Sequence, residues 1–327
     1  MRYIRNNNLN PYFNLALEEY ILKNFEEDFF LIWRNPNAII VGRHQNTYSE
    51  INLDYVETHS LPVVRRLSGG GSVYHDLGNL NFTFIMKNDQ KESATFQDFT
   101  KPIIEVLHDL SVDAAFSGRN DLTIEGRKFS GNAQYHYKDR TLHHGTILFS
   151  SNMSDLSGAL KHKEGKFKDK SVKSVQSRVT NISDHLKEPL SIEAFQDKIM
   201  DHIMNQYGKD HLYSLTPEDI EAVNQLVRDK YATWGWNFGK SPAYNYVTEH
   251  KFPGGLVEIH MNVSQGKIED LQLYGDFFAK RDIQPITDAL IGADHEREAL
   301  HRRLEPFTFD EYFINLSKEE LVTAFFS

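Results

Sequence analysis

Three consecutive glycines at residues 69–71 lie between two segments predicted to be strands, and this loop constrains the fold more than any other feature. Arg65 and Arg66 lie four and three positions before the first of these glycines. Glycine readily adopts positive φ, so such a loop can bring bare backbone N–H groups against an anion, and the arginines add positive charge. The pattern favours a loop that binds a phosphate or a carboxylate, although a glycine-rich turn without a ligand has the same pattern.

The loop differs from the two common nucleotide-binding loops. No Gly-Lys-Ser or Gly-Lys-Thr follows the glycines, and Tyr74 occupies the place of the third glycine of the dinucleotide fingerprint. Both common loops also lead into a helix whose N-terminus binds phosphate. Here Asn79 to Met86 has the composition of a strand, so the loop is predicted to join strand to strand.

The remaining pattern predicts an α+β fold. Apolar residues at helical spacing between Phe96 and Leu110 predict a helix, whereas short runs rich in Phe, Ile and Val predict buried strands. The expected helices lie within 15–25, 96–110, 192–207 and 217–231, and the expected strands are 29–33, 38–41, one ending at 62–66, 80–86, 121–130 and 141–149.

A second domain is predicted near the C-terminus. The segment from Trp234 to Pro242 interrupts the pattern, which then restarts with strands at 255–263 and 267–273 and a helical tail. We expect a mixed-sheet domain at residues 1–244 and a small α+β domain at residues 245–327.

Composition excludes several classes of function. The formal net charge of −10 argues against a nucleic-acid-binding protein. The chain has no cysteine, so it has no disulfide, no thiolate metal ligand and no cysteine nucleophile. No apolar run approaches the ~20 residues that span a bilayer, and the N-terminus is polar. We therefore expect a soluble, cytoplasmic protein that does not bind membranes.

A hairpin that carries a lysine is the second candidate functional segment. Glu125-Gly126 suits a two-residue turn, in which glycine supplies positive φ. The resulting register pairs Thr123 with Lys128 and Asp121 with Ser130 and places these four side chains on one polar face. The pattern also fits a surface hairpin with a solvated lysine.

Two other groups of residues are less informative. The run from Lys161 to Arg178 is basic in an acidic chain, which is typical of a solvated loop. The histidines at 136, 143 and 144 lack the spacing of common zinc motifs and have no thiolate partner, so no metal site is expected there.

The segment from Arg65 to Asn79 reads Arg-Arg-x-Ser-Gly-Gly-Gly-x-Val-x-His-Asp-x-Gly-Asn, and it resembles the signature loop of lipoate–protein ligases. The segment Gly-Arg-Lys-Phe-Ser-Gly-Asn-Ala at 126–133 resembles the family segment that carries its essential lysine. Weaker similarities at 143–149, 170–181, 254–255 and 275–278 extend the resemblance over essentially the whole chain. It implies the catalytic domain shared by biotin and lipoate ligases, followed by a small accessory domain.

The resemblance implies that the protein activates lipoate with ATP to give lipoyl-AMP and then transfers the lipoyl group to a lysine of a carrier domain. The implied carriers are the E2 subunits of 2-oxoacid dehydrogenase complexes and the glycine cleavage H protein. Mg²⁺ is implied as the ion bound to the ATP phosphates, with Asp121 as the candidate protein ligand. A monomer is expected.

The resemblance also implies site residues. Lys128 is the expected catalytic residue, which would stabilise negative charge during adenylation. The expected ATP and adenylate contacts are Arg66, Gly71, Ser72, Val73, Tyr74, Asp121, Lys128, Ala133, Lys173 and Arg178, and the expected lipoate contacts are Gly70, Gly71, His75, Lys128 and His144.

Two other functions fit the same fold class. An acyltransferase that moves lipoyl groups without ATP uses a cysteine acyl intermediate, which this chain cannot form. A non-catalytic binding protein with a retained ligase fold is the alternative function, and the intact glycine loop and Lys128 argue against it. The sequence does not distinguish lipoate from octanoate as the preferred substrate.

Overall fold

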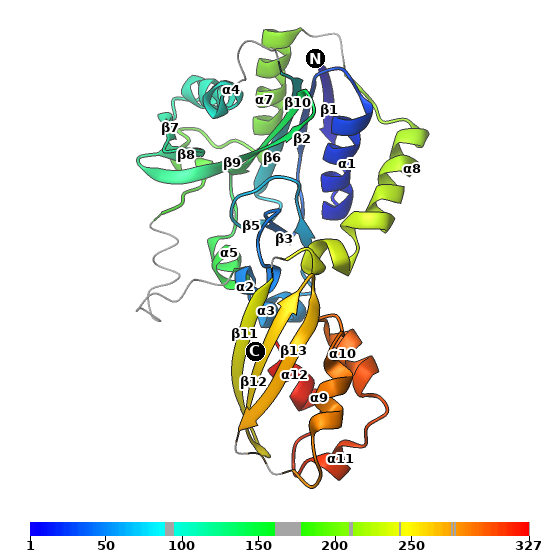
Figure 1. The fold of residues 1–327 in the computed structure, drawn as a ribbon. Helices are drawn as coiled ribbons and strands as arrows, with labels where there is room; N and C mark the ends of the chain where they lie inside the picture. The colour runs from blue at the N-terminus through cyan, green and yellow to red at the C-terminus, as the bar shows by residue number, and fades with distance from the viewer. Residues whose placement is uncertain are drawn as a thin grey trace. The chain divides into compact units, whose positions relative to one another are not determined.

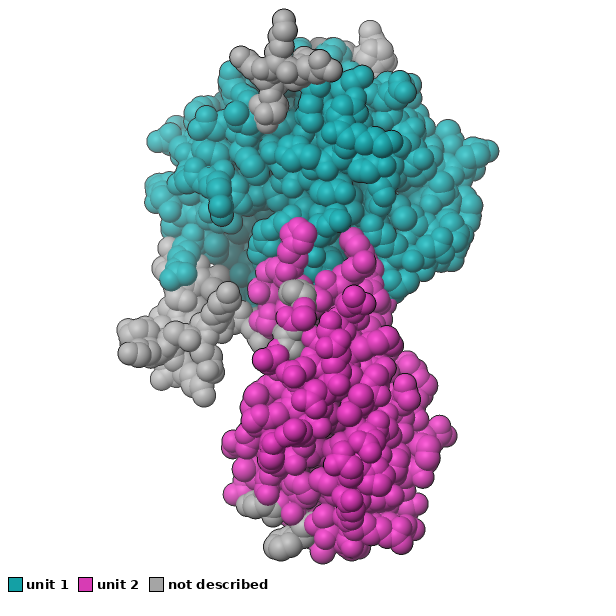
Figure 2. Space-filling view, in the orientation of Figure 1, with its two compact units in different colours: residues 1–43, 55–233 teal, residues 44–54, 234–327 magenta. Residues whose placement is uncertain are grey.

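The computed structural model describes residues 1–88, 95–160, 178–208, 212–241, 243–275, 277 and 279–326. The chain forms two compact units, one of Met1–Arg43 with Tyr55–Thr233 and one of His44–Asp54 with Trp234–Ser327 (Figure 2). These units are defined by packing, so the expected functional division after residue 244 remains a prediction.

The larger unit contains a seven-stranded sheet in the order β1-β2-β6-β10-β9-β8-β7 (Figure 1). β1 runs parallel to β2, and the other neighbouring strands are antiparallel, so the sheet is mixed, as the sequence predicts. The strands are β1 (Arg2–Asn6), β2 (Phe29–Trp33), β6 (Asn79–Lys87), β7 (Ala114–Ser117), β8 (Asp121–Ile124), β9 (Arg127–Tyr137) and β10 (Arg140–Leu148).

A smaller sheet of this unit positions the glycine loop. It consists of β3 (Ala38–Val41), which pairs in parallel with β4 (Val63–Arg65) and antiparallel with β5 (Val73–His75). The glycine loop connects β4 to β5, which confirms the predicted strand-to-strand connection. Two short helices, α2 (Thr47–Glu50) and α3 (Leu53–Thr58), lie in the chain between β3 and β4.

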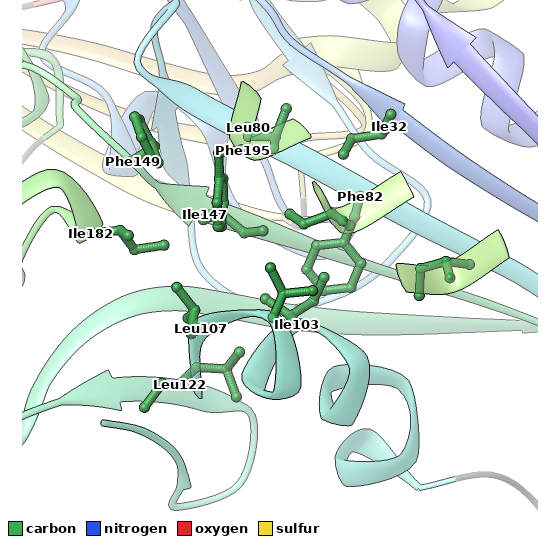
Figure 3. Packing of buried hydrophobic residues seen from close by; sticks show 14 of the residues in the cluster. Ile32, Leu80, Phe82, Ile103, Leu107, Leu122, Ile147, Phe149, Ile182 and Phe195 are labelled. Carbon is green, nitrogen blue, oxygen red and sulfur yellow. The ribbon is translucent and has the colours of Figure 1, made fainter. Parts of the chain in front are cut away.

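Helices cover both faces of the seven-stranded sheet (Figure 1). α4 (Phe96–Asp109) and α7 (Ile192–Tyr207) bury apolar side chains against one face, where Ile103, Phe195 and Phe82 belong to one core (Figure 3). α1 (Pro11–Asn24) contacts β6 and β10 from the opposite face, with α8 (Pro217–Leu226) beside it. α5 (Met153–Ala159), η1 (Ile182–His185) and η2 (Val227–Tyr231) also belong to this unit.

The alternation of β6 separates a core face from a polar face. Leu80, Phe82 and Phe84 join the core with α4 and α7. Side chains of a strand point alternately to opposite faces, so Asn81 and Thr83 face α1 and the glycine loop instead. Both are at most 2% exposed. The sheet therefore presents buried polar groups on the face that carries the candidate site.

The second unit has its own sheet and core. β11 (Tyr244–Phe252), β12 (Gly255–Ser264) and β13 (Lys267–Gly275) form an antiparallel sheet, whereas the sequence predicted only the second and third strands. η3 (Gly235–Gly239), α9 (Gln284–Leu290), α10 (Arg297–Leu304), α11 (Phe309–Tyr312) and α12 (Lys318–Ala324) accompany it.

The segment His44–Asp54 packs with this second unit because its side chains bond to it. Thr47 Oγ1 donates to the Asn237 carbonyl at 2.6 Å, and Tyr48 Oη donates to the His295 carbonyl at 2.7 Å. Across the described residues of both units, no helix combines the length and the hydropathy that crossing a membrane requires.

Candidate active site

A cavity of about 640 Å³, including the space at its open mouth, lies within the larger unit. Residues of the glycine loop, β9 and β10 contribute to its walls, and one residue of α1 joins them. The lining residues are Leu15, Trp33, Ile40, Arg66, Gly70, Gly71, Ser72, Val73, His75, Asn81, Asn120, Lys128, Gly131, Asn132, Ala133, His144, Gly145 and Thr146.

The lysine hairpin has the predicted turn but a different register. Glu125 and Gly126 both have positive φ, at 51° and 75°, as a two-residue hairpin turn requires. Thr123 lies opposite Lys128, as predicted. The predicted pairing of Asp121 with Ser130 is wrong: Asp121 lies opposite Gly131. The reason is a β-bulge, which inserts one extra residue into β9 after Lys128.

The bulge allows Lys128 and Asp121 to form an ion pair, with Lys128 Nζ 2.8 Å from Asp121 Oδ1. The lysine side chain lies over Gly131, where an added Cβ would be only 2.8 Å from Nζ, so the glycine leaves room for it. Both side chains are slightly more than a third exposed, and such pairs contribute little to stability. Lys128 can therefore exchange the carboxylate for oxygens of a ligand at low cost.

Arg66 fixes the conformation of the glycine loop through hydrogen bonds to backbone carbonyls. Its buried guanidinium donates from Nη2 to the carbonyls of Gly69 (2.7 Å) and Gly71 (2.8 Å) and from Nη1 to the carbonyl of Ile40 (3.2 Å). Burial lowers the pKa of Arg66 to about 10, which still leaves it charged at neutral pH. Arg65 is also buried and donates to backbone carbonyls, so both arginines shape the backbone around the cavity.

A buried hydrogen-bond network connects the loop to α1. His144 Nε2 lies 2.6 Å from Ser68 Oγ, and Arg66 Nε donates to the same hydroxyl at 3.0 Å. The other ring nitrogen, Nδ1, lies 3.1 Å from both carboxylate oxygens of Glu18. Thr83 Oγ1 donates to Glu18 at 2.6 Å. The network fixes His144 at the cavity wall and ties the loop to the sheet.

His75 is a neutral side chain with a defined tautomer. Asn14 Nδ2 donates to Asn35 Oδ1 at 2.8 Å, which directs Asn35 Nδ2 toward His75 Nδ1 at 3.0 Å. Nδ1 is then the acceptor, so Nε2 carries the proton. Burial, with further contributions from the charge of Arg66 and from His144, lowers the pKa of His75 to about 3. The imidazole therefore presents an N–H donor at physiological pH.

This lowered pKa predicts a loss of stability in acid. The folded-state pKa of His75 lies below its unfolded value of 6.5. The stability that neutral His75 contributes to the fold is therefore complete above pH 6.5 and is lost as the pH falls toward 3. Between pH 7 and pH 5 we expect the free energy of unfolding to fall by about 2 kcal/mol more in the wild type than in His75→Gln. Urea unfolding at both pH values measures the difference. Equal pH dependence in the two proteins would mean that His75 takes up a proton in the folded state.

The structure places nine of the expected site residues along the cavity: Arg66, Gly70, Gly71, Ser72, Val73, His75, Lys128, Ala133 and His144. Tyr74 does not line it, because it alternates with Val73 and His75 along β5. Burial and the nearby charge of Asp155 raise the pKa of Tyr74. Asp121 also lies outside the lining but contacts it through Lys128.

Two expected adenylate contacts lie on the segment after α5. The Arg178 carbonyl accepts the backbone N–H of Lys128 at 2.8 Å, so this part of the chain pairs with β9 directly at the lysine. The Arg178 side chain is exposed and does not line the cavity. Lys173 lies outside the described residues.

About half of the lining residues were not predicted from the sequence. Glu18, which contacts the lining residue His144, was also not predicted. Glu18 lies on the buried face of α1, and a carboxylate at such a position is a recognisable signal. The missed lining residues are Leu15, Trp33, Ile40, Asn81, Asn120, Gly131, Asn132, Gly145 and Thr146.

Comparison with known proteins relates this architecture to one family. Residues 10–204 match the lipoyl protein ligase A/B catalytic domain, and residues 241–325 match the C-terminus of bacterial lipoate protein ligases. The chain is 43% identical to lipoate-protein ligase LplJ of Bacillus subtilis over 98% of this chain and 99% of the relative. It is also 43% identical to lipoate–protein ligase 1 of Staphylococcus aureus, over the same shares.

Solved structures agree with these matches. A bi-partite lipoate protein ligase of Thermoplasma acidophilum superposes with a TM-score of 0.67 at 28% identity, covering 73% of this chain and 96% of that chain. A lipoate-protein ligase A bound with ATP gives 0.64 at 25% identity, covering 73% and 98%. LipL1 of P. falciparum, in complex with lipoate, gives 0.60 at 27% identity and covers 98% of both chains.

The fold and the cavity define an α+β enzyme of the lipoyl ligase class, with a separate C-terminal part. Since both family models match and the curated relatives align over nearly the full length, this chain belongs to the lipoate–protein ligase family.

Proposed function

We propose that this ligase works in two steps within the one cavity. In the first step a carboxylate oxygen of lipoate attacks the α-phosphorus of ATP, the bond to the β-phosphate oxygen breaks, and pyrophosphate leaves. In the second step the neutral ε-amine of a carrier lysine attacks the carbonyl carbon of lipoyl-AMP. An amide forms as the attacking nitrogen releases a proton to solvent, and AMP leaves with the oxygen that lipoate contributed.

The observation that carries the proposal is the presence of Lys128 and the glycine loop on the walls of one cavity. Adenylation concentrates negative charge where the carboxylate meets the α-phosphate, and a fixed ammonium there stabilises the transition state. Lysine is a compact charge on a flexible stem, so Lys128 can follow the oxygens as the geometry changes. The exposed ion pair with Asp121 holds the ammonium near this place before the ligand binds.

Mg²⁺ would reach this site with ATP. The described residues contain no group of three or more His, Cys, Asp or Glu side chains that could hold a metal ion by themselves. Mg²⁺ in nucleotide sites is commonly held by one or two carboxylates together with phosphate oxygens, and Asp121 beside Lys128 fits that mode. The ion would neutralise phosphate charge and favour departure of pyrophosphate.

The ligands and the partner reported for related ligases support the proposed substrates. LipL1 is described in complex with lipoate, one ligase A is described with bound ATP, and the Thermoplasma ligase is described with its E2 lipoyl domain. By analogy with the Thermoplasma ligase this protein would act on E2 lipoyl domains. We further propose that it acts on the glycine cleavage H protein and works as a cytoplasmic monomer. Its second unit would serve as the accessory domain.

Mass spectrometry of candidate carrier domains tests the proposal. After incubation with the enzyme, ATP, Mg²⁺ and lipoate, a carrier should gain one lipoyl group on one lysine. Reactions that lack ATP, and carriers whose acceptor lysine is replaced by arginine, are the controls. Binding of lipoate and ATP without any modified carrier would instead favour the alternative of a non-catalytic binding protein.

A further inference from the structure

The floor of the cavity is a row of residues that crosses four strands of the sheet. Trp33 on β2 lies opposite Asn81 on β6, Asn81 lies opposite Thr146 on β10, and Thr146 lies opposite Gly131 on β9. All four line the cavity. Directly opposite residues of neighbouring strands point to the same face, so the row runs across the sheet as one surface.

This row gives the cavity two chemically different ends. Lys128 lies over Gly131 and so marks the end where the carboxylate would react. Asn81 is two strand spacings away, roughly 10 Å. An extended eight-carbon acyl chain that starts at Lys128 spans a comparable distance, so its last carbons would lie beside Asn81.

His75 lies at the same end of the cavity as Asn81, which we call the distal end because it is far from Lys128. Its ring lies 6.1 Å from that of Trp33, measured between centroids in an edge-on arrangement, and it lines the cavity. The indole N–H of Trp33 is already committed, since it donates to Thr83 Oγ1 at 3.0 Å. His75 and Asn81 remain as polar side chains that this end can offer a ligand.

Both residues present a nitrogen that has no partner. Among the described residues nothing bonds to His75 Nε2 or to Asn81 Nδ2, and each side chain is 2% exposed. His75 Nδ1 is used by Asn35, and Asn81 Oδ1 accepts from Asn79 Nδ2 at 3.0 Å. Buried donors are nearly always hydrogen-bonded, and leaving one unsatisfied is costly. Two such donors at one end of a ligand cavity indicate that the ligand supplies the acceptors.

We propose that His75 and Asn81 select acyl chains with a hydrogen-bond acceptor near their distal end. The dithiolane sulfurs of lipoate are weak acceptors and meet this requirement, whereas the hydrocarbon end of octanoate does not. Octanoate would cover both donors without bonding to them, and sites built to bond a substrate group discriminate against analogues that lack it. This inference rests on the proposed function and defines which acid the site prefers.

Titration calorimetry of free acids against the full-length protein tests the inference without depending on turnover. The probes are lipoate, octanoate and 7-oxooctanoate, whose ketone is an acceptor on an otherwise similar chain. Wild-type protein should bind lipoate and 7-oxooctanoate roughly ten-fold more tightly than octanoate. Equal affinities for all three would overturn the inference, although ligase activity would be untouched. If no acid binds, both the inference and the proposed function are wrong.

Variants assign the effect to the two residues. His75→Phe keeps a ring of similar size without the N–H and should reduce the preference over octanoate to near unity, as should Asn81→Leu. His75→Gln keeps an amide N–H near the position of Nε2 and should restore much of the preference. Thermal melting of each variant checks the fold. A preference that persists in both His75→Phe and Asn81→Leu would contradict the assignment.

Discussion

Replacement of Lys128 by alanine should reduce the rate of pyrophosphate release by about 10²–10³-fold or more while the protein stays folded. This is the scale expected for removing one preorganised electrostatic contact with the transition state. Stability should change little, because Lys128 and Asp121 are 40% and 37% exposed and such ion pairs contribute roughly 0–1 kcal/mol. A coupled pyrophosphate assay measures the rate, and thermal melting measures the fold.

Lys87→Ala is the matched control. Lys87 ends β6 in the same sheet and is also paired with an aspartate, since its Nζ lies 3.6 Å from Asp139, but it does not line the cavity. It should release pyrophosphate at the wild-type rate. A folded Lys128→Ala protein with near-normal activity would remove Lys128 from the chemical step and leave the hairpin as a surface feature.

Replacement of Gly70 by valine should abolish detectable binding of the adenylate, which means at least a 100-fold loss of affinity for a non-hydrolysable lipoyl-AMP analogue. Gly70 has φ +93°, a conformation that a β-branched residue resists. An added Cβ would also lie 3.0 Å from Arg66 Nη2, the group that bonds the loop carbonyls. Either effect displaces the loop from the shape that lines the cavity. Isothermal titration with the analogue measures the affinity.

Gly118→Val separates loss of the site from general backbone strain. Gly118 also has positive φ, at +62°, but a Cβ added there would meet nothing within 4 Å, and the residue does not line the cavity. It should lower the melting temperature and leave the affinity unchanged. Unchanged affinity in Gly70→Val itself would show that the loop is a turn without a ligand-binding role.

Elements defined by local pattern could be predicted from the sequence. The apolar runs at 29–33 and 38–41 became β2 and β3 with the predicted bounds. The turn at Glu125-Gly126 also formed as predicted, because a two-residue hairpin turn depends on local conformational preferences. β11 was missed because its residues are mixed polar and apolar, and at the edge of its sheet only one side pairs with a strand.

Features set by tertiary packing could not be predicted. The bulge after Lys128 leaves the alternating pattern almost unchanged, yet it moves Gly131 opposite Asp121. Asn81 and Thr83 alternate with apolar residues as in a strand with one solvated face, but α1 and the glycine loop bury them. The arginines illustrate the same limit: their charge suggested phosphate contacts, whereas the structure commits Arg66 largely to loop carbonyls.

The absence of cysteine restricts the route by which the acyl group can be transferred. A thioester route needs a thiolate nucleophile, and this chain has none. The acyl group must then be activated at its carboxylate, and in an adenylate one carboxylate oxygen of lipoate becomes bonded to the α-phosphorus. That oxygen leaves with AMP when the carrier lysine attacks.

The measurement that tests this account most directly is the fate of oxygen-18 in lipoate labelled in both carboxylate oxygens. After complete transfer to a carrier domain in the presence of ATP, mass spectrometry should find one labelled oxygen in AMP and the other in the new amide, with one AMP formed per lipoyl group. Label in inorganic phosphate together with ADP, or transfer to the carrier without nucleotide, would contradict the adenylate route.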